Sequence, residues 1–308
     1  MIWRLEAMGK SGFEGTVLGT LVMPYCSGMG NLIFAFLLGS KGGPGQEVLT
    51  NALVNNITNL TLLIGLPAII WGMSVLPAAK AKAKPSKKKK KDNSQEHKVN
   101  RLSLLLTLTA AIFFTGVVWA LAQDGKLDFA DGMVLVGLFL FWQCFHVFEV
   151  LKTNVRQNRS FTWMLPVNLA LLAVGAYAIY VSTEWLVDWV SQSHTGFLSA
   201  RYLGWLSGWL MALPNGLLAF YYARRGNPEV VYASQVGDGH ISIPLSLGIY
   251  ALYQPMPLPG FFQTAVIILI GAATIHFLFV ALLGRLPRWM GWVLTGAYAV
   301  FLYKGLGK

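Results

Sequence analysis

Residues 237–242 read Gly-Asp-Gly-His-Ile-Ser and lie in the middle of an otherwise apolar run of the chain. A run of about 20 apolar residues is long enough to cross the hydrocarbon core of a bilayer. A polar side chain at that depth must face protein or water, because lipid offers it no hydrogen-bond partner. The run that contains Asp238 holds no lysine or arginine, so this segment favours a functional site over simple helix packing.

Three other segments combine glycine or proline with polar side chains in the middle of apolar runs. They are Ser27–Gly28–Met29–Gly30–Asn31, Asn55–Asn56–Ile57–Thr58–Asn59 and Leu213–Pro214–Asn215–Gly216. Each half of the chain thus has two successive spans with such a segment. The first span of one pair starts on the inner side of the membrane and the first span of the other pair starts on the outer side, so the repeats are inverted. Interrupted helices at matching places of inverted repeats indicate an ion site near the midplane. Each segment taken alone also has a plain explanation as close helix packing or an interhelical amide bond.

Composition places the whole chain in the membrane class. Hydrophobic residues make up 55% of its 308 residues, charged residues only 12%, and the mean hydropathy is +0.54. Soluble domains carry roughly 25% charged residues. We therefore expect an all-α polytopic membrane protein with about nine transmembrane helices in two inverted-topology repeats. The expected spans are 13–38, 48–77, 102–123, 130–151, 162–187, 198–222, 229–253, 260–283 and 286–306.

The formal charge of +11 is concentrated in a lysine-rich segment, where Lys80 to Lys98 contain nine lysines. Such a block favours a solvated loop, a topology signal and contact with anionic lipids over nucleic-acid binding. Placing it in the cytoplasm puts the other basic loops on the same side, so we expect an inner-membrane protein with a cytoplasmic N-terminus and an external C-terminus. We divide the chain into a first helix pair (1–78), the lysine-rich cytoplasmic loop (79–101), the remaining first-half helices (102–160) and a second half (161–308) containing the second repeat (198–253).

The paired segments resemble the α-repeats of the cation/calcium exchanger superfamily, the sodium/calcium exchangers. A repeat of that family reads like Gly-Thr-Ser-Leu-Pro-Glu in one helix and Gly-Ser-Asn-Ile-x-Asn in the next. Here the better match is Met211–Ala212–Leu213–Pro214–Asn215 followed by Val236–Gly237–Asp238–Gly239. The helix that precedes the first repeat in the family has no counterpart, because residues 1–12 are too short for one.

The resemblance implies a membrane cation transporter or antiporter with altered ion selectivity. Asn31 and Asn215 stand where the family has its ion-binding glutamates. Asp238 stands where the second repeat of the family has serine, and Ser242 stands where it has Asn or Asp. With a single carboxylate, monovalent ions or proton-linked exchange become more plausible than tight calcium binding. The implied ligands of a transported cation (Na, K, Ca or a proton) are Ser27, Asn31, Asn55, Asn59, Asn215, Asp238 and Ser242.

An alternative is a non-transporting structural or accessory membrane subunit built on the same fold. The two replaced glutamates favour it, and the tryptophans of residues 185–209 suit contacts with membrane partners as well as an interfacial belt. An intramembrane enzyme finds no support beyond His240 beside Asp238, and the sequence carries no zinc motif. We expect no enzymatic activity, no tightly bound cofactor and no nucleic-acid partner.

Overall fold

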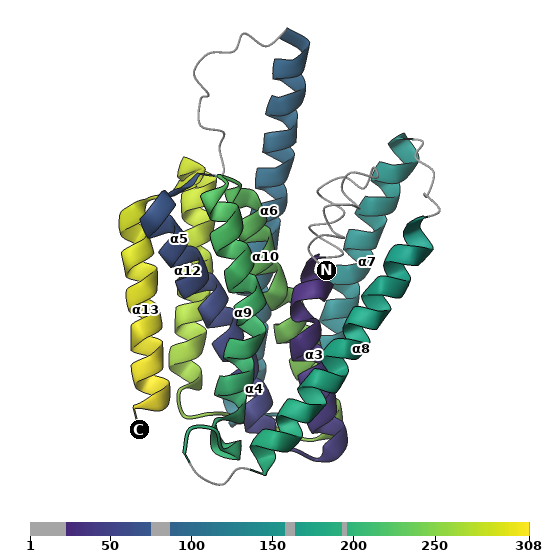
Figure 1. The fold of residues 1–308 in the computed structure, drawn as a ribbon, viewed down its shortest axis with the longest axis vertical. Helices are drawn as coiled ribbons and strands as arrows, with labels where there is room; N and C mark the ends of the chain where they lie inside the picture. The colour runs from purple at the N-terminus through teal and green to yellow at the C-terminus, as the bar shows by residue number, and fades with distance from the viewer. Residues whose placement is uncertain (1–22, 75–86, 158–163, 193–195, 308) are drawn as a thin grey trace.

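The computed structural model describes residues 23–74, 87–157, 164–192 and 196–307. In these residues the chain forms nine long helical segments that pack into an elongated bundle (Figure 1). The segments are α3 (Met23–Lys41), α4 (Gly45–Ile57) continued by η2 (Thr58–Leu62) and α5 (Leu63–Trp71), α6 (Lys87–Leu121), α7 (Phe129–Gln157), α8 (Met164–Ser191), α9 (Leu203–Arg224), α10 (Pro228–Ile241) continued by η5 (Ser242–Ser246) and α11 (Leu247–Tyr253), α12 (Phe262–Leu283) and α13 (Arg288–Leu306). Single-turn helices η3 (Ala122–Asp124) and η4 (Ala200–Tyr202) lie between them.

The prediction of an all-α polytopic membrane fold is confirmed. Each helical segment overlaps one of the predicted spans, although residues 13–22 of the first span lie outside the described residues. By length and composition alone, four described helices are apolar enough to cross a membrane. They are Gly45–Trp71, Arg101–Asp124, Ala200–Arg224 and Phe262–Leu283.

The lysine-rich loop is shorter than the sequence indicated. Helix α6 begins at Lys87, so the residues from Lys87 to Arg101, which we assigned to a loop, are helical. Lysine is a good helix former, and the packing of α6 against α12 lets the helix propagate backward from its buried part. In Figure 1 this part of α6 projects beyond the bundle. Residues 79–86 of the expected loop lie outside the described residues.

Two pairs of very short strands tie the halves of the chain together. β1 (Met73–Ser74) pairs with β4 (Arg285–Leu286), and β2 (Lys126–Leu127) pairs with β3 (Met256–Pro257), both antiparallel. β1 and β3 each follow a π-interrupted helix, and each pairs with the hairpin between two helices of the opposite half. The helices also pack across the two halves, because α4 of the first half packs on α9 of the second, and α10 of the second half packs on α3 of the first. The two repeats are therefore interlocked, as expected for inverted repeats.

Glycines mark equivalent close contacts in the two halves. A Cβ atom on Gly65 would lie 3.1 Å from the carbonyl oxygen of Gly291, and one on Gly132 would lie 2.9 Å from that of Gly248. The first contact joins α5 to α13 and the second joins α7 to α11. Gly65 and Gly248 follow the polar segments of their repeats at corresponding places. The repeat that the sequence indicates is thus visible in the packing.

The helix interruptions fall in one helix of each repeat rather than in two. The segment after Ile57 and the segment after Ile241 each form a five-residue π-helix, η2 and η5. In contrast, α3 runs without a break through Gly30, and α9 through Pro214, so the expected breaks at those two places are wrong. Neighbouring helices can support a proline inside a packed membrane helix, and this explains the continuity of α9.

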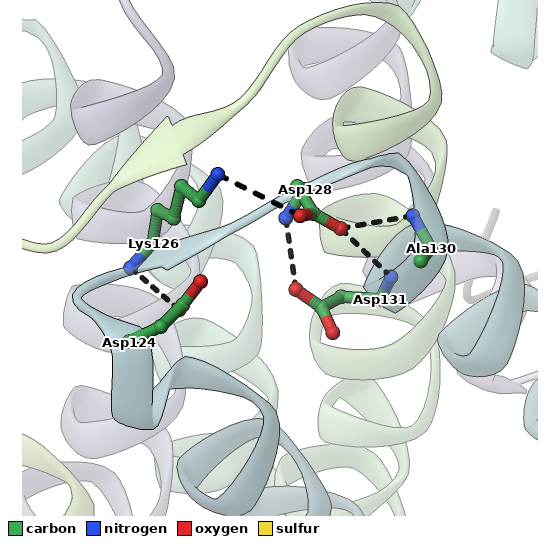
Figure 2. A network of polar contacts seen from close by, with 5 residues as sticks. All are labelled: Asp124, Lys126, Asp128, Ala130 and Asp131. Atoms are coloured by element: carbon green, nitrogen blue, oxygen red, sulfur yellow. Dashed lines mark hydrogen bonds and ion pairs between the residues drawn. The ribbon is translucent and has the colours of Figure 1, made fainter.

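Helix α7 starts with a reciprocal pair of aspartates (Figure 2). The backbone N–H groups of Ala130 and Asp131 donate to Oδ1 of Asp128, at 3.0 and 3.4 Å, and the N–H of Asp128 donates to Oδ2 of Asp131 at 2.9 Å. This arrangement satisfies the free N–H groups of the first turn. Lys126 Nζ lies 3.7 Å from Asp128 Oδ2. The network fixes the turn between β2 and α7 at the end of the bundle opposite the lysine run.

Candidate functional site

The centre of the candidate site is the carboxylate of Asp238, which is fully buried between the two repeats. Its Oδ2 atom accepts hydrogen bonds from the side-chain amides of Asn55 and Asn59, the latter at 2.9 Å. Asn55 and Asn59 are one helical turn apart on α4 and η2, so they present their amides on the same face. The first repeat thus supplies two neutral donors to the single charge of the second repeat.

Ser242 lies one turn after Asp238 and extends the polar cluster into η5. Its hydroxyl donates to the backbone carbonyl of Asp238 at 2.9 Å and accepts from Nδ2 of Asn56 at 2.7 Å. Asn56 also donates to the carbonyl of Ala52 at 2.7 Å. The helices approach closely here, because a Cβ atom on Gly239 would lie 2.8 Å from Oδ1 of Asn56. Asn56 was part of the polar segment quoted above but not of the predicted ligand set.

Asn215 joins the cluster from α9. Its Nδ2 lies 3.5 Å from Oδ1 of Asn59, and its backbone carbonyl accepts a 3.0 Å hydrogen bond from Nε2 of Gln235. Gln235 was missed by the sequence reasoning. It is fully buried on α10, three residues before Asp238 and hence on the same face of the helix. A side-chain amide in an apolar span, one turn before the aspartate, was the signal that could have identified it.

Asn31 contributes from α3, where it is 1% exposed. Neither Oδ1 nor Nδ2 of Asn31 has a hydrogen-bond partner among the described residues. One turn earlier, Gly28 brings α3 against α10, since a Cβ atom there would lie 2.8 Å from Ile241 Cβ and 3.3 Å from Asp238 Oδ1. Asn31 therefore lies next to the Asp238 region. The side chain of Ser27, the remaining predicted ligand, lies outside the described residues.

The chemistry of the cluster is that of neutral oxygen donors around one carboxylate. Besides Asn31 Oδ1, the buried amide oxygens of Asn55 and Gln235 have no hydrogen-bond partner within the described part of the chain. Leaving such groups unsatisfied in the interior is costly, and carboxylate and amide oxygens are the ligands that hard cations prefer. No group of three His, Cys, Asp or Glu residues comes together in the described ranges. The cluster is suited to binding a small cation of low charge.

Two buried histidines near the cluster, His240 and His276, contact backbone carbonyls. His240 lies 2.9 Å, through Nε2, from the carbonyl of Thr107 on α6, and its ring contacts Phe114 and Trp142. His276 of α12 is fully buried and places Nε2 2.8 Å from the carbonyl of Leu60. Leu60 belongs to η2, directly after Asn59, so His276 supports the interrupted helix of the first repeat.

Comparisons with known proteins identify the family and the fold of the chain. The family model described as "Sodium/calcium exchanger protein" matches residues 1–148 and 167–304 of the chain. No curated protein sequence matches the chain significantly. Among solved structures, the sodium-calcium exchanger NCX_Mj soaked with 10 mM Na⁺ and 10 mM Sr²⁺ is similar, with a TM-score of 0.62 and 19% identity over 96% of this chain and 89% of that one. The same exchanger soaked with 2.5 mM Na⁺ and 0.1 mM Ca²⁺ gives a TM-score of 0.61 and 20% identity over the same shares. At this identity the likeness concerns the fold.

Proposed function

The chain belongs to the sodium/calcium exchanger protein family, and from this premise we propose that it is a membrane cation antiporter with altered ion selectivity. The family is one of transporters rather than enzymes. The observation that carries the proposal is the fully buried carboxylate of Asp238, which lies among side-chain amides from both repeats. The ligands we propose are the predicted set with Gln235 added.

Charge determines which ions the site favours. Tight calcium sites use several carboxylates, whereas Asn31 and Asn215 are neutral and Asp238 alone contributes a full negative charge. Rotating an amide by 180° exchanges its N–H₂ group for its oxygen. Asn55 and Asn59 can therefore either donate to Asp238 or, after rotation, turn their oxygens toward a cation that the carboxylate attracts. Monovalent cations or proton-linked exchange suit this site better than calcium.

The alternative function is a non-transporting structural or accessory subunit of the same fold. One observation favours it, because Oδ2 of Asp238 already accepts two amide hydrogen bonds and the carboxylate is thus stabilised by protein donors. In that case the amides of Asn55 and Asn59 serve to join the repeats. The two functions differ in what neutralising Asp238 does to ion binding, and the following experiment uses that difference.

The test is a thermal-shift series on the purified full chain in detergent, with sodium, potassium, calcium and pH varied separately. An antiporter site predicts that at least one ion raises the melting temperature, and that Asp238→Asn removes the shift while leaving the protein folded, because the amide keeps the shape and loses the charge. Asp188→Asn is the matched control, since Asp188 is an exposed carboxylate near the end of α8. Equal ion-dependent shifts in wild type and Asp238→Asn, or none in either, would favour the accessory subunit.

Location follows from the basic residues. We propose a multi-pass protein of the inner (plasma) membrane, with the start of α6 and its run Lys87–Lys91 in the cytoplasm. Lysines close to the membrane surface contribute about 1 kcal/mol each to contact with anionic headgroups. Anionic lipids are therefore the partners that we assign to this segment.

A further inference from the structure

A second buried carboxylate lies away from the site, at the start of α4. Glu47 is 9% exposed, and its Oε2 accepts a 2.6 Å hydrogen bond from the backbone N–H of Gly204 in the first turn of α9. Among the described residues Glu47 makes no ion pair, and the nearby cation Lys41 is bound to Glu184 and Asp188. A buried carboxylate without a cation is costly unless it carries a proton.

Glu47 begins a row of polar residues that ends at Asp238. Asn51, Asn55 and Asn59 follow it at intervals of four residues, so each side chain lies one turn beyond the one before it and the four form a row along the helix. Each of the three asparagines is at most 1% exposed. Asn55 and Asn59 are the two residues that bind the Asp238 carboxylate.

Helix α9 lines the same row from the other side. Nδ2 of Asn51 donates to Ser207 Oγ at 2.9 Å and contacts Met211 Sδ at 3.3 Å. Ser207 Oγ in turn donates to the carbonyl of Leu203 at 2.7 Å and lies 3.3 Å from that of Gly204, the residue whose N–H binds Glu47. Met211 reaches α3, because a Cβ atom on Gly30 would lie 3.2 Å from Met211 Cγ. Polar contacts thus continue from Glu47 through Gly204 and Ser207 to Asn51, and Met211 packs this part of α9 against α3 one residue before Asn31.

A helix cap alone does not account for this arrangement. Capping the N-terminus of α9 requires one acceptor, which Glu47 provides, and makes no demand for buried asparagines along the next three turns. We propose that Glu47 is a proton-binding carboxyl whose charge is coupled, along this row, to cation binding at Asp238. The proposal rests on the proposed antiporter function. It adds to that function a proton-binding group, Glu47, at the end of the bundle opposite the lysine run.

The expected size of the coupling follows from distance. Eight residues of helix separate Glu47 from Asn55, which corresponds to about 12 Å. At an effective dielectric constant of about 20, a unit charge at that distance changes the affinity for a monovalent cation about tenfold. The other titratable or charged groups of the elements packed around this end are either exposed or bound to other groups. They are Lys41 (with Glu184 and Asp188), Arg201 (over the Tyr202 ring), Tyr202 and Tyr250 (donating to the Gly43 carbonyl). Further along, Asp238 and His276 face the same helix at Asn59 and Leu60, whereas His240 faces Thr107 of α6.

The decisive measurement is cation affinity as a function of pH, read from ion-dependent thermal shifts of the full chain with sodium or potassium. Glu47→Gln retains an oxygen that can accept the Gly204 bond but cannot be charged. We expect its affinity to be about tenfold below wild type at alkaline pH and equal to wild type at acidic pH, where Glu47 of the wild type is protonated. Glu184→Gln removes a half-buried charge that is paired with Lys41 at the same end, and its cation affinity should equal that of wild type at every pH. A ratio that does not change with pH would overturn the proposal.

A second measurement does not depend on ion binding. Dicyclohexylcarbodiimide modifies protonated carboxyls in apolar surroundings, so Glu47 should acquire the adduct at acidic pH and lose this reactivity as the pH rises, as read by mass spectrometry of its peptide. Absence of the adduct at every pH would refute proton binding by Glu47. If the wild type shows the adduct but no cation-dependent shift, the proposed antiporter function fails, and so does the coupling to it, while proton binding at Glu47 stands.

Discussion

Asn55 of α4 donates a hydrogen bond to the carboxylate of Asp238 on α10, and the two residues occupy equivalent positions in the two repeats. They are separated by 183 residues, as are Gly65 and Gly248, which make the matching helix contacts of the two halves. Asn59 and Ser242 share this separation. The repeats therefore meet at their own equivalent residues, and the charge lies on one side only. This asymmetry places the carboxylate in the second repeat and its two amide donors in the first.

Removing the side chain of Asn55 alone should destabilise the protein more than removing the side chains of Asn55 and Asp238 together. Asn55→Ala takes a donor from a buried carboxylate and should lower the free energy of unfolding by about 1–3 kcal/mol. Asp238→Ala in the Asn55→Ala background should recover part of the loss, because the unsatisfied charge disappears. A double-mutant cycle on unfolding in detergent measures the coupling, which we expect to exceed about 0.5 kcal/mol. Additive effects of the two substitutions would show that the bond contributes nothing specific.

Restoring acidic residues should change the ion preference. Asn31→Glu with Asn215→Glu adds two carboxylates to the Asp238 region, and divalent cations gain more from added charge than monovalent ones do. We expect calcium to become the ion with the largest thermal shift and to compete with sodium in flux measurements. Gln123→Glu, which adds a charge at an exposed position of η3, is the control and should leave the preference as in wild type. An unchanged order of ions in the double variant would place the site elsewhere.

His276 should be important for the interrupted helix of the first repeat. His276→Ala removes the donor to the Leu60 carbonyl and should cost about 1–3 kcal/mol of stability, since that carbonyl is then buried without its partner. Because Leu60 follows Asn59, cation-dependent stabilisation should weaken as well. Tyr232→Phe is the matched control, as it removes only the 3.5 Å contact to the other ring nitrogen. Similar behaviour of His276→Ala and Tyr232→Phe would argue against this role.

The orientation in the membrane remains a prediction with a direct test. The start of α6, the end of α9 and the β1–β4 pair lie at one end of the bundle, and this end carries Lys87–Lys91, Arg224, Arg225, Arg285 and Arg288. Basic loops face the cytoplasm, so a reporter fused after Lys308 should be external. Protease or alkylation access to that reporter in intact cells measures it. A cytoplasmic reporter would invert the topology and place Glu47 on the inner side.

The sequence predicted the architecture well because its dominant signals are local. Runs such as 260–283 and 229–253 differ from helices α12 and α10–η5–α11 by few residues, since an apolar run of that length has few alternatives to a membrane helix. The resemblance to sodium/calcium exchangers was confirmed by the family match. The lysine-rich segment was assigned to a loop because its charge outweighed its helix propensity, whereas the structure continues α6 through Lys87. Continuity of α9 through Pro214 was equally outside the reach of local patterns, because it depends on neighbouring helices.

By itself the sequence determined the membrane class, the helical segments of the described residues, the inverted repeat and the four polar segments, because each of these follows from residue type along a single run. Only the tertiary structure decided which of those polar groups meet. It brought Asn55 and Asn59 to Asp238 and Asn56 to Ser242, added Gln235, and placed His240 against Thr107. It also joined Glu47 to Gly204 across the repeats. The physical reason is that helix periodicity defines faces, whereas the partner of each face depends on how the two repeats pack.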